Sequence, residues 1–255
     1  SPTLINVTFL NNSAFLEGGG LYNYTNSTPI LNQVIFSGNF AKLSGGGMFI
    51  QSSAPVLSNV IFMKNLAESS SGGGGIANWE GAAPILTNVI FWANKSMNNG
   101  AGIANFNASS PILTNVTFAE NTTTDPYSGR GGGMASYNNC SPKIKNVIFW
   151  GNKVKGSITE VGADVSNMLG STNLNTVNSI LLAKNTLMQL PNTPTNYPPA
   201  LFPKIDSSYN LFAQDPLFVD ASAGNFHLQD CSPAINAGDT SGTVTHDFDG
   251  KIRPY

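Results

Sequence analysis

A phrase that recurs six times in the first 152 residues constrains the fold of this chain more than any other feature. It consists of a proline, an aliphatic residue, the run Asn-Val-x-Phe, and an asparagine three residues after the phenylalanine. The prolines are Pro2, Pro29, Pro55, Pro84, Pro111 and Pro142, at intervals of 27, 26, 29, 27 and 31 residues. A period of this size predicts a solenoid, in which each unit buries its apolar face against its neighbours.

Side-chain alternation within the phrase predicts a β-strand. Leu86, Val89 and Phe91 form an apolar set that recurs in every unit, and the prolines and glycines between units argue against helix. A glycine-rich corner and an apolar residue follow in the second half of the unit, at 18–21, 45–48, 73–76, 100–103 and 131–134. An all-β fold follows: a parallel β-helix solenoid with about 27 residues and two or three strands per coil.

Stacked coils would place equivalent residues above one another, at the roughly 4.8 Å spacing of neighbouring strands. We therefore expect a phenylalanine stack of Phe9, Phe36, Phe62, Phe91, Phe118 and Phe149. We also expect an amide ladder of Asn12, Asn39, Asn65, Asn94, Asn121 and Asn152. A second amide column would hold Asn6, Gln33, Asn59, Asn88, Asn115 and Asn146.

Two sets of motifs carry a family resemblance that covers nearly the whole chain. The Gly-Gly-Gly-aliphatic and Phe-x-x-Asn pairs resemble the polymorphic outer-membrane protein repeats of bacterial surface β-helices. The tail is similar to bacterial secreted right-handed β-helix proteins of the choice-of-anchor type. Its motifs are Asp215-Pro216-Leu217-Phe218-Val219-Asp220, Asn225-Phe226-His227-Leu228, Ser232-Pro233-Ala234-Ile235-Asn236-Ala237-Gly238 and Asp247-Phe248-Asp249-Gly250. The resemblance implies a right-handed helix exported to the bacterial cell surface.

We accordingly predict one right-handed β-helix domain over residues 1–255, with roughly seven to eight coils and a C-terminal cap. Its parts would be regular coils (1–152), a degraded coil (153–186), a proline-rich excursion (187–206), and a last coil with the cap (207–255). Because the chain opens inside a repeat, we expect it to be a fragment of a longer polypeptide.

Composition limits the partners and the compartment. Charged residues make up 10% of the chain, its net charge is −2, and asparagine alone occurs 32 times. This balance gives no basic field for nucleic acid and is typical of an extracellular or cell-surface all-β protein. No apolar run reaches the roughly 20 residues that span a membrane. Cys140 and Cys231 are too few for a disulfide framework, so we expect each to be a buried free thiol, and their pairing is open.

Catalytic and metal-binding patterns are sparse. The regular coils contain only Glu17, Glu68, Glu80, Glu120 and Asp125 as acids, without the clustering that polysaccharide-cleaving β-helices need. His227 and His246 have no evident partner, and the Asp247-x-Asp249 run fits a turn better than half of a calcium loop. We therefore predict no catalytic residues, no metal site and no cofactor.

One outward column is the candidate binding surface. Tyr24, Gln51, Trp79, Phe106 and Tyr137 stand three residues after each apolar re-entry, where alternation turns a side chain away from the interior. Tyr24, Trp79, Phe106 and Tyr137 would form a docking strip for glycan rings or a partner protein. The alternative is that a loop or the proline-rich excursion covers them.

The leading functional hypothesis is a non-catalytic structural and adhesion module, a rigid stalk or adhesin segment displayed at the bacterial surface. Its partners would be other surface proteins or glycans, within a larger assembly, with no nucleic acid and no direct membrane span. The alternative is a β-helix that binds or degrades polysaccharide as a lyase or hydrolase.

Overall fold

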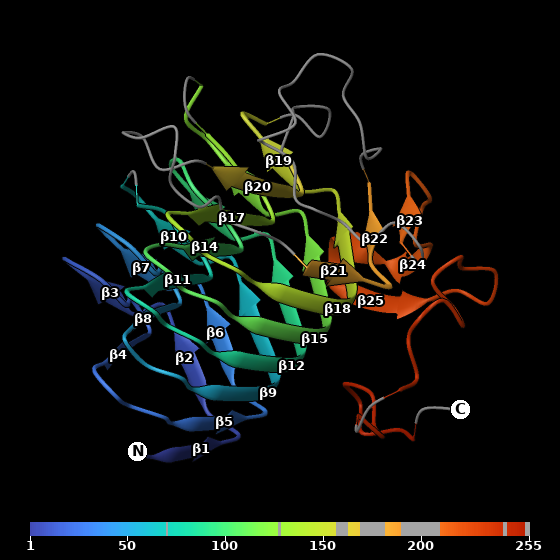
Figure 1. The fold of residues 1–255 in the computed structure, drawn as a ribbon, viewed down its shortest axis with the longest axis horizontal. Helices are drawn as coiled ribbons and strands as arrows, with labels where there is room; N and C mark the ends of the chain where they lie inside the picture. Colours follow the sequence, from blue (N-terminus) through green and yellow to red (C-terminus); the bar gives the residue numbers. More distant parts are fainter. Residues whose placement is uncertain are drawn as a thin grey trace.

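The chain folds into a stack of parallel β-coils, seen here in a computed structural model (Figure 1). The structure describes residues 1–69, 71–126, 129–156, 163–168, 182–189, 210–241 and 244–252. Each regular coil contributes strands to three sheets, which we number in the order that the chain visits them. The fold class predicted from the repeat, an all-β parallel solenoid, is confirmed, with about six turns traced by the six strands of sheets 2 and 3.

Sheet 1 is built from the repeated phrase and has eleven strands. They are β1 (Thr3–Ile5), β2 (Thr8–Leu10), β5 (Ile30–Asn32), β6 (Ile35–Ser37), β9 (Val56–Met63), β12 (Ile85–Trp92), β15 (Ile112–Ala119), β18 (Lys143–Trp150), β21 (Leu182–Lys184), β22 (Leu187–Met188) and β23 (Leu211–Phe212).

Sheets 2 and 3 follow the asparagine and the glycine corner, respectively. Sheet 2 holds β3 (Ser13–Ala14), β7 (Phe40–Ala41), β10 (Leu66–Ala67), β13 (Lys95–Ser96), β16 (Thr122–Thr123) and β19 (Lys153–Val154). Sheet 3 holds β4 (Leu21–Tyr24), β8 (Met48–Gln51), β11 (Ile76–Trp79), β14 (Ile103–Asn105), β17 (Met134–Tyr137) and β20 (Val165–Met168).

The phenylalanines of the phrase stack through the interior. Neighbouring rings lie 4.7, 4.6, 5.0, 4.8 and 4.6 Å apart from Phe9 to Phe149, with interplanar angles of 6° or less. The five rings from Phe36 onward are fully buried, whereas Phe9 in the first coil is only partly buried. The strand register that pairs Phe91 with both Phe62 and Phe118 sets this spacing.

The predicted asparagine ladder is confirmed. Each inner amide donates from Nδ2 to Oδ1 of the asparagine in the next coil, at 2.9–3.0 Å from Asn12 to Asn152. From Asn39 onward, Nδ2 also donates to the phenylalanine carbonyl of the preceding coil, as from Asn94 to Phe62 at 2.8 Å. At the far end, Asn152 donates to the Asp164 carboxylate at 3.2 Å. These contacts satisfy amides that would otherwise be costly to bury.

The second amide column marks a bend in sheet 1. Asn6, Gln33, Asn59, Asn88, Asn115 and Asn146 all have positive φ, between 53° and 56°. Asparagine tolerates this left-handed conformation better than most residues. The bend places these side chains on the outer side of sheet 1, where the amides of successive coils hydrogen-bond, as from Asn115 to Asn88 at 3.3 Å.

The third glycine of each corner allows neighbouring coils to approach closely. At Gly75, a Cβ atom would lie 2.6 Å from the Gly102 carbonyl oxygen and 2.7 Å from the Phe91 ring. Only glycine therefore fits between the next coil and the phenylalanine stack.

The C-terminal tail lies along the outer face of sheet 1 and runs back toward the N-terminal coils (Figure 1). It begins with an antiparallel pair, β24 (Phe218–Asp220) and β25 (Asn225–Leu228), joined by a 3-10 turn at Ala221–Ala223. The proposed division into coils, excursion and cap stays a prediction. Residues 190–206 of its proline-rich excursion and the middle of its degraded coil lie outside the described residues, whereas Leu187–Met188 at the start of the excursion form β22.

The two cysteines differ in environment. Cys140 is buried, and its thiol donates to the Tyr137 carbonyl at 2.9 Å. Cys231 is exposed, so the expectation that both are buried is wrong for this residue, which lies in a tail turn beyond the coil interior. The two cysteines do not form a disulfide.

Candidate functional site

Two outer surfaces of the solenoid carry the candidate binding residues. The first is the aromatic strip on sheet 3. Trp79 stacks on Phe106 at 4.6 Å, and Phe106 stacks on Tyr137 at 5.1 Å, because parallel register aligns these positions in successive coils. Tyr24 does not join this row, since Gln51 stands between it and Trp79 in the register. The Tyr24 ring instead lies 6.1 Å from the ring of Tyr22 on the same strand.

The exposure of the strip is uneven. Phe106 is 9% exposed, and Trp79 and Tyr137 are half-buried, whereas Tyr24 is 56% exposed. The Tyr137 hydroxyl donates to Asn99 Oδ1 of the neighbouring corner, and burial raises the pKa of this phenol well above its usual value. Trp79 Nε1 is buried and has no hydrogen-bond partner among the residues that the structure describes. The accessible ring surface therefore lies at the Tyr24 end, and a docking role for the strip stays a prediction.

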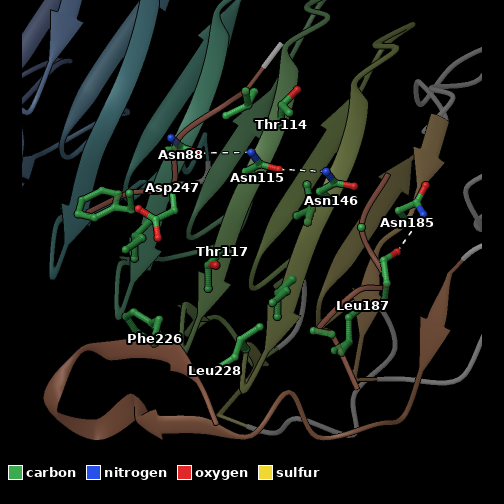
Figure 2. Close-up of a pocket in the computed structure, with 18 of the residues that line it drawn as sticks. Asn88, Thr114, Asn115, Thr117, Asn146, Asn185, Leu187, Phe226, Leu228 and Asp247 are labelled. Atoms are coloured by element: carbon green, nitrogen blue, oxygen red, sulfur yellow. Dashed lines mark hydrogen bonds between the residues drawn. The ribbon is translucent and has the colours of Figure 1, made fainter. Parts of the chain in front are cut away.

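The second surface is a cleft of about 1050 Å³ between the outer face of sheet 1 and the tail. Figure 2 shows one wall formed by Asn88, Asn115 and Asn146 with Thr114 and Thr117, and tail residues such as Phe226 facing it. The Phe226 ring packs edge-on against the Trp92 ring, with 6.0 Å between the ring centroids. The Lys64 ammonium lies 4.9 Å from the centroid of the same Trp92 ring. These contacts fix the tail to the solenoid.

Outer amides bind the tail through its backbone. Asn88 Nδ2 donates to the His246 carbonyl at 3.1 Å, and Asn185 Nδ2 donates to the Ala237 carbonyl at 2.9 Å. Asn146 makes a paired contact with Asp239, donating to its carbonyl at 3.1 Å and accepting from its amide at 2.8 Å. The sequence indicates this amide column but no docking role for it, because the column binds main-chain carbonyls of the tail, which every residue type has.

Charged groups line both the sheet 1 side and the tail side of the cleft. Lys145 forms an ion pair with Asp239 at 3.1 Å and donates to the Ser241 carbonyl. His227 Nε2 lies 2.5 Å from Asp249 Oδ2, and His227 Nδ1 lies 2.6 Å from Asn225 Oδ1. The expectation that His227 has no partner is therefore wrong: the turn at 247–250 brings Asp249 back to β25. Lys251 N donates to Asp247 Oδ1 at 2.8 Å, as expected for a turn.

The acids of the regular coils are dispersed rather than gathered on one face. Glu68 pairs with Lys42 at 2.6 Å, Glu80 accepts from Gln51 at 2.5 Å, and Glu120 accepts from the Trp92 indole at 3.2 Å. Within the described residues, no three His, Cys, Asp or Glu side chains gather closely enough to hold a metal ion. The same residues contain no helix of sufficient length and hydropathy to cross a membrane.

Comparison with known proteins agrees with this architecture. Residues 1–180 match the family described as the right handed beta helix region. The chain belongs to this family, and the handedness expected from the resemblance is thereby shown. No curated protein and no solved structure matches the chain.

Proposed function

We propose that the chain is a non-catalytic extracellular module, a rigid stalk or adhesin segment displayed at a bacterial surface. The observation that carries the proposal is the continuity of the interior. One aromatic column and one amide column run without a break through six coils, from Phe9 and Asn12 to Phe149 and Asn152. Such a stack resists bending because every coil is tied to both neighbours.

Adhesion would use the accessible end of the aromatic strip. Tyr22 and Tyr24 are both exposed, and the Tyr22 ring also stacks on Phe49 at 5.2 Å, which holds it in place. Rigid aromatic rings bind partners with little loss of conformational entropy, and they stack on sugar rings and on apolar side chains alike. The partner would be a surface glycan or another surface protein.

The test is a binding measurement on a Tyr24→Ser variant against a glycan array and a panel of surface proteins. A loss of binding with an unchanged melting temperature is expected, since an exposed substitution changes stability by about 0.5 kcal/mol at most. Phe15→Ser is the control, because Phe15 is an even more exposed ring in the same coil, at 82% against 56% for Tyr24, and lies at a different face. Equal binding by wild type and Tyr24→Ser would contradict the adhesion role of the strip.

A polysaccharide-cleaving enzyme is the second candidate, and the His227–Asp249 pair favours it. An imidazole held by a carboxylate beside a cleft can act as a general base. Assays for reducing and unsaturated sugars released from pectin, alginate and host glycans separate the two functions. The non-catalytic proposal requires no release. Release by the wild type that disappears in His227→Gln would replace it with an enzymatic function.

A further inference from the structure

The side-chain amides of the outer column have more hydrogen-bond donors than the bonds between neighbouring amides of that column occupy. A side-chain amide has two N–H donors and an oxygen with two lone pairs. At Asn146, one donation goes along the column to Asn115 at 3.0 Å, and another goes to the Asp239 carbonyl at 3.1 Å. Asn88 divides its donations in the same way, between Asn59 and His246, at 3.1 Å each. At these two rungs, one donation runs along the column and a second goes outward to a ligand.

In the C-terminal half of the column, the ligand is the chain's own tail. We call residues 236–241 and 244–247 the strap. It runs along the solenoid axis, from Asn185 past Asn146 to Asn88, and so crosses the strands of sheet 1 (Figures 1 and 2). Rungs are spaced by roughly 4.8 Å, and two residues of extended chain span up to about 6.6 Å. A slightly contracted strand can thus present Ala237 and Asp239 to successive rungs.

The rungs hold the strap through its main chain. Asn146 contacts both the N–H and the C=O of one residue, a donor–acceptor pair at the spacing of a peptide unit. A peptide backbone repeats that pair at every non-proline residue along its length. Extended polypeptide is therefore the ligand chemistry that fits this column.

The column continues beyond the strap. The tail turns back at 247–250, next to Asn88, and His246 then bridges to Ile252. Asn59 donates at 3.2 Å to Asn32, which directly precedes the column residue Gln33, and both Asn59 and Asn32 are half-exposed. The remaining column residues toward the first coil, Gln33 and Asn6, are exposed. Ile35 and Ile61 stand beside these rungs as a half-buried apolar floor.

We propose that the rungs at Asn6, Gln33, Asn32 and Asn59 bind an extended polypeptide segment from another protein molecule, as the strap is bound within the chain. The segment lies along the solenoid axis and has small side chains, like the Ala-Gly pair of the strap. Its carbonyls accept from the outward N–H of each rung. The strap and the bound segment would form one continuous row of docked backbone.

A synthetic peptide with the sequence of residues 236–247, carrying a fluorescein label, tests the proposal on the full chain. Saturable binding by fluorescence anisotropy is expected. Because the rungs contact backbone, a scrambled peptide should bind within about threefold, and a peptide N-methylated at alternate residues should lose binding. Equal binding by the N-methylated peptide would overturn the proposal, and so would binding only by a mixed panel of oligosaccharides.

Asn59→Asp and Asn138→Asp form a matched pair. Asn59 and Asn138 have φ values of 55° and 54°, and each donates to an amide in a neighbouring coil, but Asn138 lies on another face. Aspartate keeps the shape and the backbone tolerance and removes both donors. Asn59→Asp should weaken peptide binding roughly tenfold or more, and Asn138→Asp should change it less than twofold. Equal effects would overturn the proposal.

A crosslinking measurement on the wild type makes the test independent of variant folding. A benzophenone on the peptide should crosslink to residues in 32–61 when the mixture is irradiated and digested for mass spectrometry. Crosslinks confined to other parts of the chain would overturn the assignment of the site, and their absence at saturating peptide would overturn the binding itself.

Discussion

Asparagine has two different uses at the residue scale. In the inner ladder, the amides from Asn39 onward are buried, and both the oxygen and the nitrogen of each are hydrogen-bonded to neighbouring coils. Asn94, for example, donates to Phe62 and Asn121 and accepts from Asn65. In the outer column, the backbone conformation selects asparagine, because a φ near 55° is strained for most other residues. Asparagine therefore hydrogen-bonds buried polar groups in the inner ladder, and it adopts the left-handed backbone of the bend in the outer column.

Replacing Asn94 by leucine should destabilise the protein although leucine is more apolar. The change removes the side-chain partner of the Phe62 carbonyl and of the Asn65 main-chain N–H, and it takes one hydrogen bond each from the Asn65 and Asn121 side chains, in a dry interior. Each unsatisfied buried group costs about 1–3 kcal/mol, which exceeds the gain from the added apolar surface. Denaturant melts measure the loss. Asn12→Leu is the control and should cost clearly less, because Asn12 is exposed at the end of the ladder. A neutral Asn94→Leu would contradict this account.

The phenylalanine stack should show the same dependence on position. Phe91 is fully buried between Phe62 at 5.0 Å and Phe118 at 4.8 Å, whereas Phe9 stacks on one ring of the column, Phe36. Phe91→Ala should lower the free energy of unfolding by about 3–5 kcal/mol, the usual range for a buried aromatic. Phe9→Ala should cost much less. Equal losses in denaturant melts would argue against a continuous stack.

Cys140 should make the protein sensitive to alkali. Burial raises the pKa of this thiol from 9.0 to about 11, although backbone hydrogen bonds oppose the shift. The folded state therefore keeps a proton that the unfolded chain releases, so stability falls as pH rises from 9 to 11. Cys140→Ala should flatten this part of the stability–pH profile. Thiol reagents should modify only Cys231 in the native protein at pH 8, and rapid modification of Cys140 there would contradict its burial.

At the scale of the element, the sequence predicted the strand of the repeated phrase, but it did not predict the bend within sheet 1 or the burial within the aromatic row. The alternation of Leu86, Val89 and Phe91 correctly indicated a strand, since all three point inward. The bend at Asn88 was not predicted, because alternation cannot distinguish a straight strand from one with a single left-handed residue. Spacing also predicted the row of Trp79, Phe106 and Tyr137, but not the burial of its middle ring, which depends on corners distant in sequence.

The glycine corner provides a prediction at this scale. Gly75→Ala would place a Cβ against the backbone of the next coil and the Phe91 ring, so two coils must separate. Gly81 has φ +75° but open space around its Cβ position, so Gly81→Ala should cost only the backbone strain, roughly 1–2 kcal/mol. Gly75→Ala should cost more than Gly81→Ala in thermal or denaturant melts. The reverse order would show that the coils are not packed closely at the corner.

At the scale of the whole molecule, the free energy of opening a coil should vary along the solenoid axis. Interior residues of the middle coils, such as Leu86 and Val89, are buried on both sides. Their counterparts in the first coil, Leu4 and Val7, are only partly buried. In a repeat protein, stability is a sum of coil and interface contributions, so a coil with one interface opens at lower free energy.

Hydrogen exchange should therefore show a gradient of protection, and two amides allow a matched comparison. Asn11 N donates to Ser37 O at 2.9 Å in the first coil, and Ala93 N donates to Ala119 O at 3.0 Å in the fourth. Both residues have φ near 54° and occupy the same place in the repeat. Because their hydrogen bonds are equivalent, a difference in protection reports the opening of the coil. Asn11 should exchange roughly a hundredfold faster, corresponding to about 2.7 kcal/mol of opening free energy. Equal protection of the two amides would mean that the coils open together and that the molecule behaves as one cooperative unit.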